Sequence, residues 1–276
     1  LLSLNAPLLS VDIDLNYIGS TYKKGMMSDR LRVYQAVTAV CSREKYVLKR
    51  TPDDHAGGKW RMSYIGSRGH PGNLELDINY MFRIPLWPTA VRECRLLGSR
   101  KSLPFRVLDI HELAAGKLAA LFSRNASRDL FDCRALLNDQ FIDMEKLRLG
   151  FVIYGGVNRK DWRTLSIDDI KANAKDVKTE LMPMLRSDVT PGANEIDSWT
   201  AQLVSECRDR LSGLLPFSKS EIEFLNRLND YGEIIPDLLT TDPSLISIIR
   251  QFPGLKWKAM NVRKKHGLNF SSEMDE

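Results

Sequence analysis

Alternation of apolar and polar residues predicts strands in the first part of the chain. Residues 11–15 and 74–80 alternate strictly, and residues 45–49 and 60–65 form further strand-like runs between segments rich in Gly, Pro and Asp. Residues 28–40 instead place valines at i, i+4 and i+7, which favours an amphipathic helix that lies across a sheet. We therefore expect strands arranged around one helix.

From residue 109 onward the pattern becomes helical. Asp109, with Glu112 three residues later, is typical of a capping box, and the apolar spacing continues to Arg124. A second helix is predicted at 127–137. Later helix starts are indicated at Ser166 with Asp169, at Ser218 with Glu221 and at Asp242 before Pro243, with breaks at Pro191-Gly192 and Leu215-Pro216. We predict an α+β fold with one domain at 1–140 and a mostly helical domain at 141–276.

Composition narrows the function classes only slightly. The 276 residues are 43% hydrophobic, enough for one large domain or two ordinary ones, and the net charge of +5 permits an acidic partner such as a nucleotide or nucleic acid without demanding one. No apolar run approaches the roughly 20 residues that cross a bilayer, so no membrane association is expected. Four scattered cysteines and four dispersed histidines predict reduced thiols in a cytoplasmic protein and no zinc site.

The most informative motif is a pair of carboxylates inside the first apolar strand. Side chains at i and i+2 of a strand share a face about 6.6 Å apart, so Asp12 and Asp14 lie together while Ile13 and Leu15 point the other way. Like charges this close repel and cost solvation, which a divalent cation between them would offset. The alternative is that both are polar residues on the exposed face of an edge strand.

Asp77 adds a third carboxylate on the polar face of the strand at 74–80. Mg2+ prefers hard oxygen ligands and is usually held by a few carboxylates together with substrate phosphates. Two such ions about 3.5 to 4 Å apart can hold the attacking and leaving oxygens of an in-line phosphoryl displacement. The three aspartates therefore indicate nucleotidyl transfer, unless Asp77 merely continues an exposed polar face.

Charged residues of the two predicted helices suit a nucleotide. Lys117 and Arg124 lie on one helix stripe, and Asp129 and Asp132 share a face of the next helix. A lysine ammonium suits a triphosphate, and a guanidinium can bind phosphate oxygens bidentately. The alternative is that Lys117 is solvated and Asp129 complements a helix dipole, with Arg128 as a surface neighbour.

Four successive motifs resemble those of the AbiEii/AbiGii nucleotidyltransferase toxins. They are LNAPLLSVDIDL at 4–15, LDI at 76–78, LAAGKLAALFSR at 113–124 and RDLFD at 128–132. The resemblance implies a small mixed sheet of a DNA-polymerase-β-like core flanked by helices and followed by the helical domain. It implies metal ligands at Asp12, Asp14 and Asp77, catalytic roles for these three with Lys117 and Asp129, and nucleotide-binding roles for Lys117, Arg124, Arg128 and Asp132.

The same resemblance implies a reaction and partners. The enzyme would transfer a nucleoside monophosphate from an NTP to a hydroxyl acceptor, with Mg2+, two ions being expected. The acceptor in the family can be RNA, notably the 3′ end of tRNA. The protein would be the toxin half of a bacterial type IV toxin-antitoxin or abortive-infection phage-defence pair, with a cognate antitoxin as partner.

Two positions depart from the family pattern. The family places Gly followed by Ser or Thr shortly before the Asp pair, where backbone amides cradle phosphates, and no such turn lies between Leu1 and Asp12. The resemblance thus implies that the chain begins inside the first motif, which leaves open whether it is active as it stands. The residue before Lys117 is Gly116, where the family tends to have an acidic residue.

Other functions stay open on the sequence. The same metal site would serve a small-molecule nucleotidyltransferase of the aminoglycoside-modifying kind, or a catalytically inactive nucleotide-binding or antitoxin-binding module. A hydrolase is disfavoured because no Ser-His-Asp or Cys-His set is apparent. A basic run near the C-terminus either contacts a nucleic-acid backbone or is a solvated helix face; it comprises Lys256, Lys258, Arg263, Lys264 and Lys265.

Overall fold

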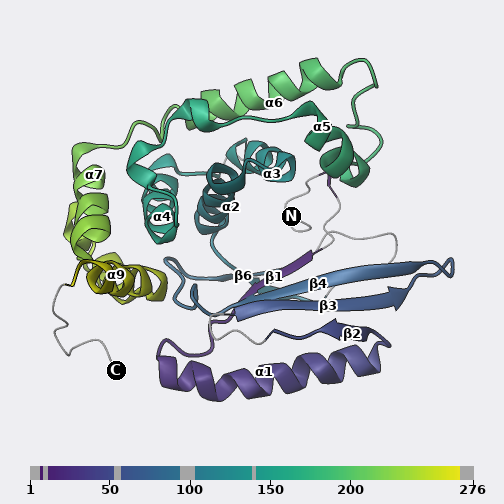
Figure 1. The fold of residues 1–276 in the computed structure, drawn as a ribbon, viewed down its shortest axis with the longest axis horizontal. Helices are drawn as coiled ribbons and strands as arrows, with labels where there is room; N and C mark the ends of the chain where they lie inside the picture. Colours follow the sequence, from purple (N-terminus) through teal and green to yellow (C-terminus); the bar gives the residue numbers. More distant parts are fainter. Residues whose placement is uncertain (1–6, 9–11, 53–56, 94–102, 139–140, 268–276) are drawn as a thin grey trace. The chain divides into compact units, whose positions relative to one another are not determined.

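The computed structural model describes residues 7–8, 12–52, 57–93, 103–138 and 141–267. Its elements follow the α+β pattern predicted from the sequence (Figure 1). The strands are β1 (Asp12–Asn16), β2 (Val47–Arg50), β3 (Gly57–Ile65), β4 (Pro71–Asn79), β5 (Ala90–Arg92) and β6 (Phe105–Val107). The α-helices are α1 (Lys23–Arg43), α2 (Ile110–Arg124), α3 (Ser127–Leu137), α4 (Met144–Val157), α5 (Ala174–Asp176), α6 (Ile196–Leu211), α7 (Lys219–Asn226), α8 (Pro243–Gln251) and α9 (Pro253–His266).

Short 3₁₀ and π segments connect the later helices. They are η1 (Trp162–Thr164), η2 (Ile167–Asp169), η3 (Val177–Leu181), η4 (Met182–Met184), η5 (Arg227–Tyr231) and η6 (Pro236–Leu238). The second half of the described chain is therefore helical, as predicted. Among the described residues, no helix combines the length and the apolar character that crossing a bilayer would require.

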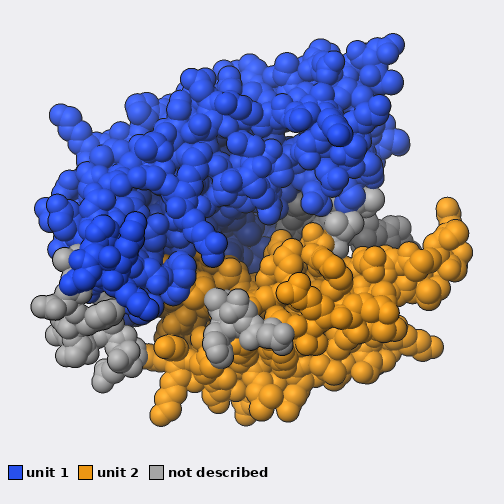
Figure 2. All heavy atoms as spheres, in the orientation of Figure 1, with its two compact units in different colours: residues 1–9, 85–251, 255–268 blue, residues 10–84, 252–254, 269–276 orange. Residues whose placement is uncertain are grey.

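Two compact units make up the chain (Figure 2). Unit 1 comprises residues 1–9, 85–251 and 255–268, and unit 2 comprises residues 10–84, 252–254 and 269–276. These units are defined by compactness alone. The predicted boundary near residue 140, between a nucleotidyltransferase core and a helical domain, therefore stays a prediction.

Unit 2 is built on a four-stranded mixed sheet with the order β1-β4-β3-β2. β1 pairs with β4 in parallel, whereas β3 pairs with both β4 and β2 in antiparallel fashion. A parallel pair needs a long crossover connection, which here includes α1 and the two intervening strands. The small mixed sheet predicted for the first part of the chain is confirmed.

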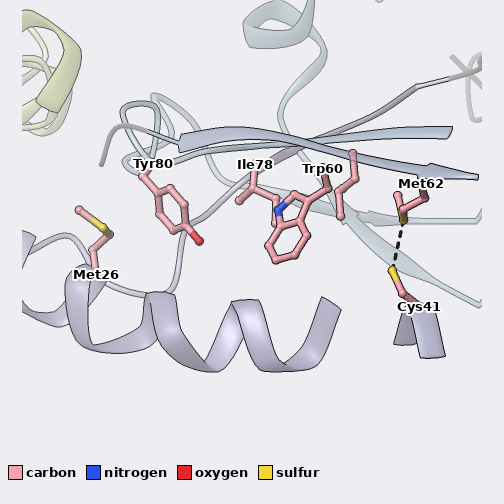
Figure 3. Packing of buried hydrophobic residues seen from close by; sticks show 7 residues of the cluster. Met26, Cys41, Trp60, Met62, Ile78 and Tyr80 are labelled. Atoms are coloured by element: carbon pink, nitrogen blue, oxygen red, sulfur yellow. Dashed lines mark hydrogen bonds between the residues drawn. The ribbon is translucent and has the colours of Figure 1, made fainter. Parts of the chain in front are cut away.

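Helix α1 covers one face of this sheet (Figure 3). Trp60, Met62 and Ile78 point from β3 and β4 toward α1, where Met26 and Cys41 are buried in the same cluster. Because side chains alternate along a strand, the residues between these apolar positions lie on the opposite face. The hydrophobic alternation of the sequence thus separates an α1-covered face from a polar face.

Element boundaries in unit 2 differ from the predicted ones by a few residues. Helix α1 begins at Lys23 and not at residue 28. The sequence missed this start because the first turn of the helix has no apolar stripe to mark it. Strand β3 begins at Gly57, whose φ of 133° is accessible to glycine, so two residues assigned to a loop join the sheet. Strand β4 ends at Asn79, where the Oδ1 atom accepts hydrogen bonds from the backbone amides of Met81 and Phe82.

Unit 1 contains α2 and α3 at the bounds that the sequence pattern predicts. Asp109 caps α2 by accepting a hydrogen bond from the amide of His111, but the predicted capping box is wrong. Glu112 is only 1% exposed, and it turns into the core to accept hydrogen bonds from the amide of Leu86 and the hydroxyl of Tyr154. The buried Leu86 amide and Tyr154 hydroxyl both need a hydrogen-bond acceptor, and Glu112 serves them and not the start of its own helix.

Two of the three later start signals open α-helices. Ser218 and Glu221 form a reciprocal capping box on α7, and Asp242 accepts hydrogen bonds from the first amides of α8. Ser166 and Asp169 form the same box, but it opens the three-residue 3₁₀ segment η2 and not a longer helix. Three cysteines are buried free thiols, namely Cys41, Cys133 and Cys207, and Cys94 lies outside the described residues.

Candidate active site

The parallel pairing of β1 with β4 brings the three predicted metal ligands to neighbouring positions. In the backbone register Asp14 lies opposite Asp77, and Asp12 lies opposite Glu75. All four carboxylates alternate with the apolar residues Ile13 and Ile78, so they share the face of the sheet opposite α1. Register, which no local pattern of the sequence specifies, is what places Asp14 beside Asp77.

The electrostatics of Asp77 reflect this crowding. Burial raises the pKa of its carboxyl above the usual range, and the neighbouring carboxylates of Asp14 and Glu75 raise it further. Lys59, directly opposite Asp77 in the β3–β4 register, acts in the other direction and lowers the pKa. A cation near Asp77 is thus favourable in the folded unit.

Three charged residues that sequence reasoning did not single out lie on the same face. Glu75 accepts a hydrogen bond from the Lys59 Nζ at 3.1 Å and two from Arg61, at 3.0 Å from Nε and 2.7 Å from Nη2. These bonds lower the pKa of Glu75, and the bond to Glu75 is the main cause that raises the pKa of Lys59. The available signal was the alternation of Lys59, Trp60, Arg61 and Met62, which places both cations on the polar face.

The donor set suits a hard divalent cation, although the side chains are not gathered into a finished site. No cluster of three or more His, Cys, Asp or Glu side chains within the described part of the chain is arranged to hold a metal ion. Asp12, Asp14 and Asp77 nevertheless offer carboxylate oxygens at adjacent register positions, which is the ligand type that Mg2+ prefers. The residues present therefore fit such an ion in chemistry and charge.

In unit 1 the predicted nucleotide-binding residues form two ion pairs between α2 and α3. Lys117 Nζ lies 2.9 Å from Asp132 Oδ2; the lysine side chain is 33% exposed and the aspartate 4%. Burial raises the pKa of Asp132 and Lys117 lowers it. The other carboxylate oxygen of Asp132, Oδ1, is buried and has no hydrogen-bond partner among the described residues.

The second pair joins Arg124 to Asp129. The guanidinium donates two hydrogen bonds, of 2.5 Å from Nε to Oδ2 and 2.8 Å from Nη2 to Oδ1. Asp129 is 3% exposed in its side chain and lies in the first turn of α3, where a negative charge also complements the helix dipole. Arg128, which precedes Asp129 in the first turn of α3, is exposed. The structure thus groups the predicted residues into one set in each unit.

Comparison with known proteins identifies the family of the chain. The model of the family described as nucleotidyl transferase AbiEii toxin, Type IV toxin-antitoxin system, matches residues 6–202, a span that includes every predicted site residue. The chain belongs to the AbiEii family. Membership makes it a nucleotidyltransferase-family protein for which an NTP substrate and an antitoxin partner are implied.

One solved structure is similar to this AbiEii-family chain. It is the nucleotidyltransferase toxin MenT4 from Mycobacterium tuberculosis H37Rv, with 15% sequence identity, a TM-score of 0.46, and coverage of 76% of this chain and 67% of that one. No functionally curated protein matches the chain.

Proposed function

We propose that the protein transfers a nucleoside monophosphate from an NTP to a hydroxyl acceptor, with RNA, and notably a tRNA 3′ end, as the expected acceptor. The observation that carries this proposal is the register that sets Asp14 beside Asp77, with Asp12 on the same face. Membership in a nucleotidyl transferase family supports the reaction type. Carboxylates at adjacent register positions of the sheet support it further, because phosphoryl transfer with divalent cations uses carboxylate ligands.

Asp12, Asp14 and Asp77 would hold Mg2+, expected as two ions. When bound, the ions neutralise negative charge on the triphosphate and on the attacking and leaving oxygens. A carboxylate of this set would accept the proton of the acceptor hydroxyl. The acceptor oxygen forms a bond to the α-phosphorus, the bond from that phosphorus to the bridging oxygen breaks, and pyrophosphate leaves with the electron pair.

Lys117 would contact the triphosphate of the incoming NTP. Its ammonium is partly exposed, so it can reach a ligand, and the buried carboxylate of Asp132 holds it in place. Arg124 is bound to Asp129, so these two residues first of all fix α3 against the end of α2, the helix that carries Lys117. Arg128 is exposed and offers a further cation for phosphate.

The test is a transfer assay with the full-length protein. The protein is incubated with Mg2+ and each NTP labelled at the α-phosphate, first with total RNA and then with small hydroxyl acceptors. Label on RNA is the expected result. Label on a small acceptor alone would assign the activity to a small-molecule nucleotidyltransferase, and NTP binding without any labelled product would identify an inactive binding module.

A matched pair of variants keeps the assay specific to the site. Asp14→Asn removes one carboxylate of the set and should abolish labelling. Asp209→Asn removes an exposed carboxylate from α6 in unit 1 and should label RNA as the wild type does. Equal activity of Asp14→Asn and Asp209→Asn would overturn the assignment of Asp14.

We further propose that the protein acts in the bacterial cytoplasm as the toxin of a phage-defence pair. The family description, which names a type IV toxin-antitoxin system, supports this role. Induced expression should arrest bacterial growth, co-expression of its cognate antitoxin should relieve the arrest, and Asp14→Asn should not arrest growth. Arrest by Asp14→Asn equal to that by the wild type would contradict a toxic nucleotidyl transfer.

A further inference from the structure

Three basic side chains continue the polar face of the unit 2 sheet away from the carboxylates. Lys59 lies opposite Asp77 and Arg61 lies opposite Glu75 in the β3–β4 register. A bulge in β2 then brings Arg50 opposite Arg61 in the β2–β3 register. Opposed residues of an antiparallel pair point to the same face, so these three cations form a basic strip across two strands.

The basic strip lies on the side of the sheet that α1 does not cover. Its β3 residues alternate with Trp60 and Met62, which point into the core against α1 (Figure 3). The side chains of Lys59 and Arg61 are 54% and 56% exposed, and Arg50 is exposed. Arg50 and Arg61 lie on neighbouring strands about 4.8 Å apart, and Lys59 and Arg61 are i, i+2 positions about 6.6 Å apart. The strip is therefore an extended surface.

Charge changes sign along this face. Asp12, Asp14 and Asp77 make the β1 and β4 part negative. Arg50, Lys59 and Arg61 make the β2 and β3 part positive, with Glu75 opposite Arg61 and Asp77 opposite Lys59 at the border between the two parts. Arg50 forms no ion pair with any residue that the structure describes. Lys59 and Arg61 both form ion pairs with Glu75.

We propose that the basic strip binds the phosphate backbone of a single-stranded nucleic-acid acceptor and leads its terminal hydroxyl to the carboxylates. The inference rests on the proposed function and names a surface for its acceptor. An extended row of exposed cations matches a polymer that repeats a phosphate on every residue, whereas one triphosphate occupies a compact site. Phosphate oxygens replace the Glu75 carboxylate as partners of Arg61, because a guanidinium binds both bidentately.

The test compares two double variants with the same charge change in the same unit. Arg50→Ala with Arg61→Ala removes two cations of the strip. Arg32→Ala with Arg43→Ala removes two exposed arginines of α1, each of which pairs with a carboxylate as Arg61 does. Binding of a fluorescein-labelled single-stranded RNA oligonucleotide is measured by anisotropy over a range of salt concentrations.

The strip variant should bind the oligonucleotide about 10-fold more weakly, in line with the loss of two phosphate contacts. The slope of log affinity against log salt should fall by about 1.4, which is about 0.7 for each contact with a single strand. The α1 variant should keep the affinity and slope of the wild type. Equal weakening by both variants, or no binding by the wild type, would overturn the proposal.

Glu75→Gln supplies a readout that a merely structural role cannot mimic. This change removes the carboxylate that neutralises Lys59 and Arg61, so it should tighten oligonucleotide binding several-fold. If Glu75 only held the sheet together, Glu75→Gln and the strip variant would both weaken binding. Weaker binding by Glu75→Gln therefore counts against the strip as an acceptor surface.

Two further measurements separate this inference from the proposed function. Binding of the oligonucleotide through the strip without transfer to any acceptor would sink the proposed function and leave the strip standing. Conversely, transfer to RNA that the Arg50 and Arg61 changes leave untouched would sink the strip alone. Loss of antitoxin binding with unchanged RNA binding in the strip variant would make the strip a protein interface, which also overturns the proposal.

Discussion

Burial makes Glu112 a residue whose protonation affects the stability of unit 1. Desolvation raises the pKa of this carboxyl from 4.5 to about 7, even though the Tyr154 hydroxyl and the Leu86 amide both donate to it. A raised pKa means that the folded protein binds the proton more tightly than the unfolded chain does. This contribution to stability is fully present below about pH 4.5 and is lost as the pH rises through about 7.

Glu112→Gln should remove this dependence. The amide is uncharged at every pH, so the variant should exceed the wild type in free energy of unfolding by roughly 3 kcal/mol at pH 8, with little difference at pH 4.5. Urea unfolding at both pH values checks this, with the exposed Glu180→Gln as control. Destabilisation by Glu112→Gln at pH 8 would show that the charged form is the one the fold requires.

The pair Lys117 and Asp132 combines a structural role with the proposed binding role, and two variants separate them. Lys117→Met leaves the buried Asp132 without this partner, which should cost about 2 kcal/mol and also abolish NTP binding. Adding Asp132→Asn removes the buried negative charge that has lost its lysine partner. The double variant should therefore recover the free energy of unfolding but not NTP binding. Recovery of NTP binding by the double variant, measured by calorimetry, would exclude Lys117 as a nucleotide contact.

Alternation along a single strand could be read from the sequence, and it predicted which residues share a face. The pairing register between strands could not be read from the sequence, so the neighbours across strands were missed. The shared face of Asp12 and Asp14 follows from their spacing alone. Lys59 and Arg61 gained their significance only when the β3–β4 pairing set them beside Asp77 and Glu75. The role of Glu112 could not be predicted because its partners, Leu86 and Tyr154, are 26 and 42 residues away.

At the scale of elements, α4 packs against η1 so closely that a glycine is required. A Cβ at Gly155 would lie 1.9 to 2.2 Å from indole atoms of Trp162. Gly155→Ala should lower the free energy of unfolding by about 3 kcal/mol. Gly213→Ala is the control, because its Cβ would approach only the flexible end of Met144, at 3.4 Å.

Trp162→Leu tests the cause of that loss. In the Gly155→Ala background the smaller side chain makes room for the new methyl group, so the two changes together should cost less than the sum of their separate effects. Chemical unfolding of the four proteins gives the coupling energy. Strict additivity would place the cost of Gly155→Ala in the helix and not in its contact with Trp162.

Helices α2 and α3 were predictable because apolar spacing and end signals agree over more than ten residues. The short strands and the short 3₁₀ and π segments could not be predicted. Strands β5 and β6 have three residues each, too few to establish a period. Likewise η3 and η4 follow one another around Pro183, where the hydrogen-bond pattern shifts from π to 3₁₀ because proline cannot donate.

At the scale of the whole molecule, the carboxylate set should store repulsion that a bound cation relieves. On the proposed function, Mg2+ with a non-hydrolysable NTP would bind the native state and should raise the Tm of the wild type. Asp14→Asn should melt in EDTA at the wild-type temperature or above and gain little from Mg2+ and nucleotide. Melting of Asp14→Asn well below the wild type in EDTA would make Asp14 a structural residue.

The fold class could be predicted for the whole chain, whereas contacts between its distant segments could not. The sequence pattern changes from strands to helices near residue 109, yet Pro7 and Leu8, which precede the first strand, contact residues of the helical part. Leu8 forms a β-bridge with Leu185, and the Pro7 carbonyl accepts a hydrogen bond from the Arg186 amide. Contacts between such distant segments leave no local trace in the sequence.

The parallel pairing of β1 with β4 also governs when the carboxylates meet during synthesis. Asp14 and Asp77 are 63 residues apart, so closing this pair requires a long loop whose entropy must be offset by the rest of the sheet. The antiparallel β2–β3–β4 meander has shorter loops and can form first. In a nascent chain Asp14 and Asp77 therefore stay apart until β4 has left the ribosome, so the proposed transfer site cannot assemble during the early part of translation.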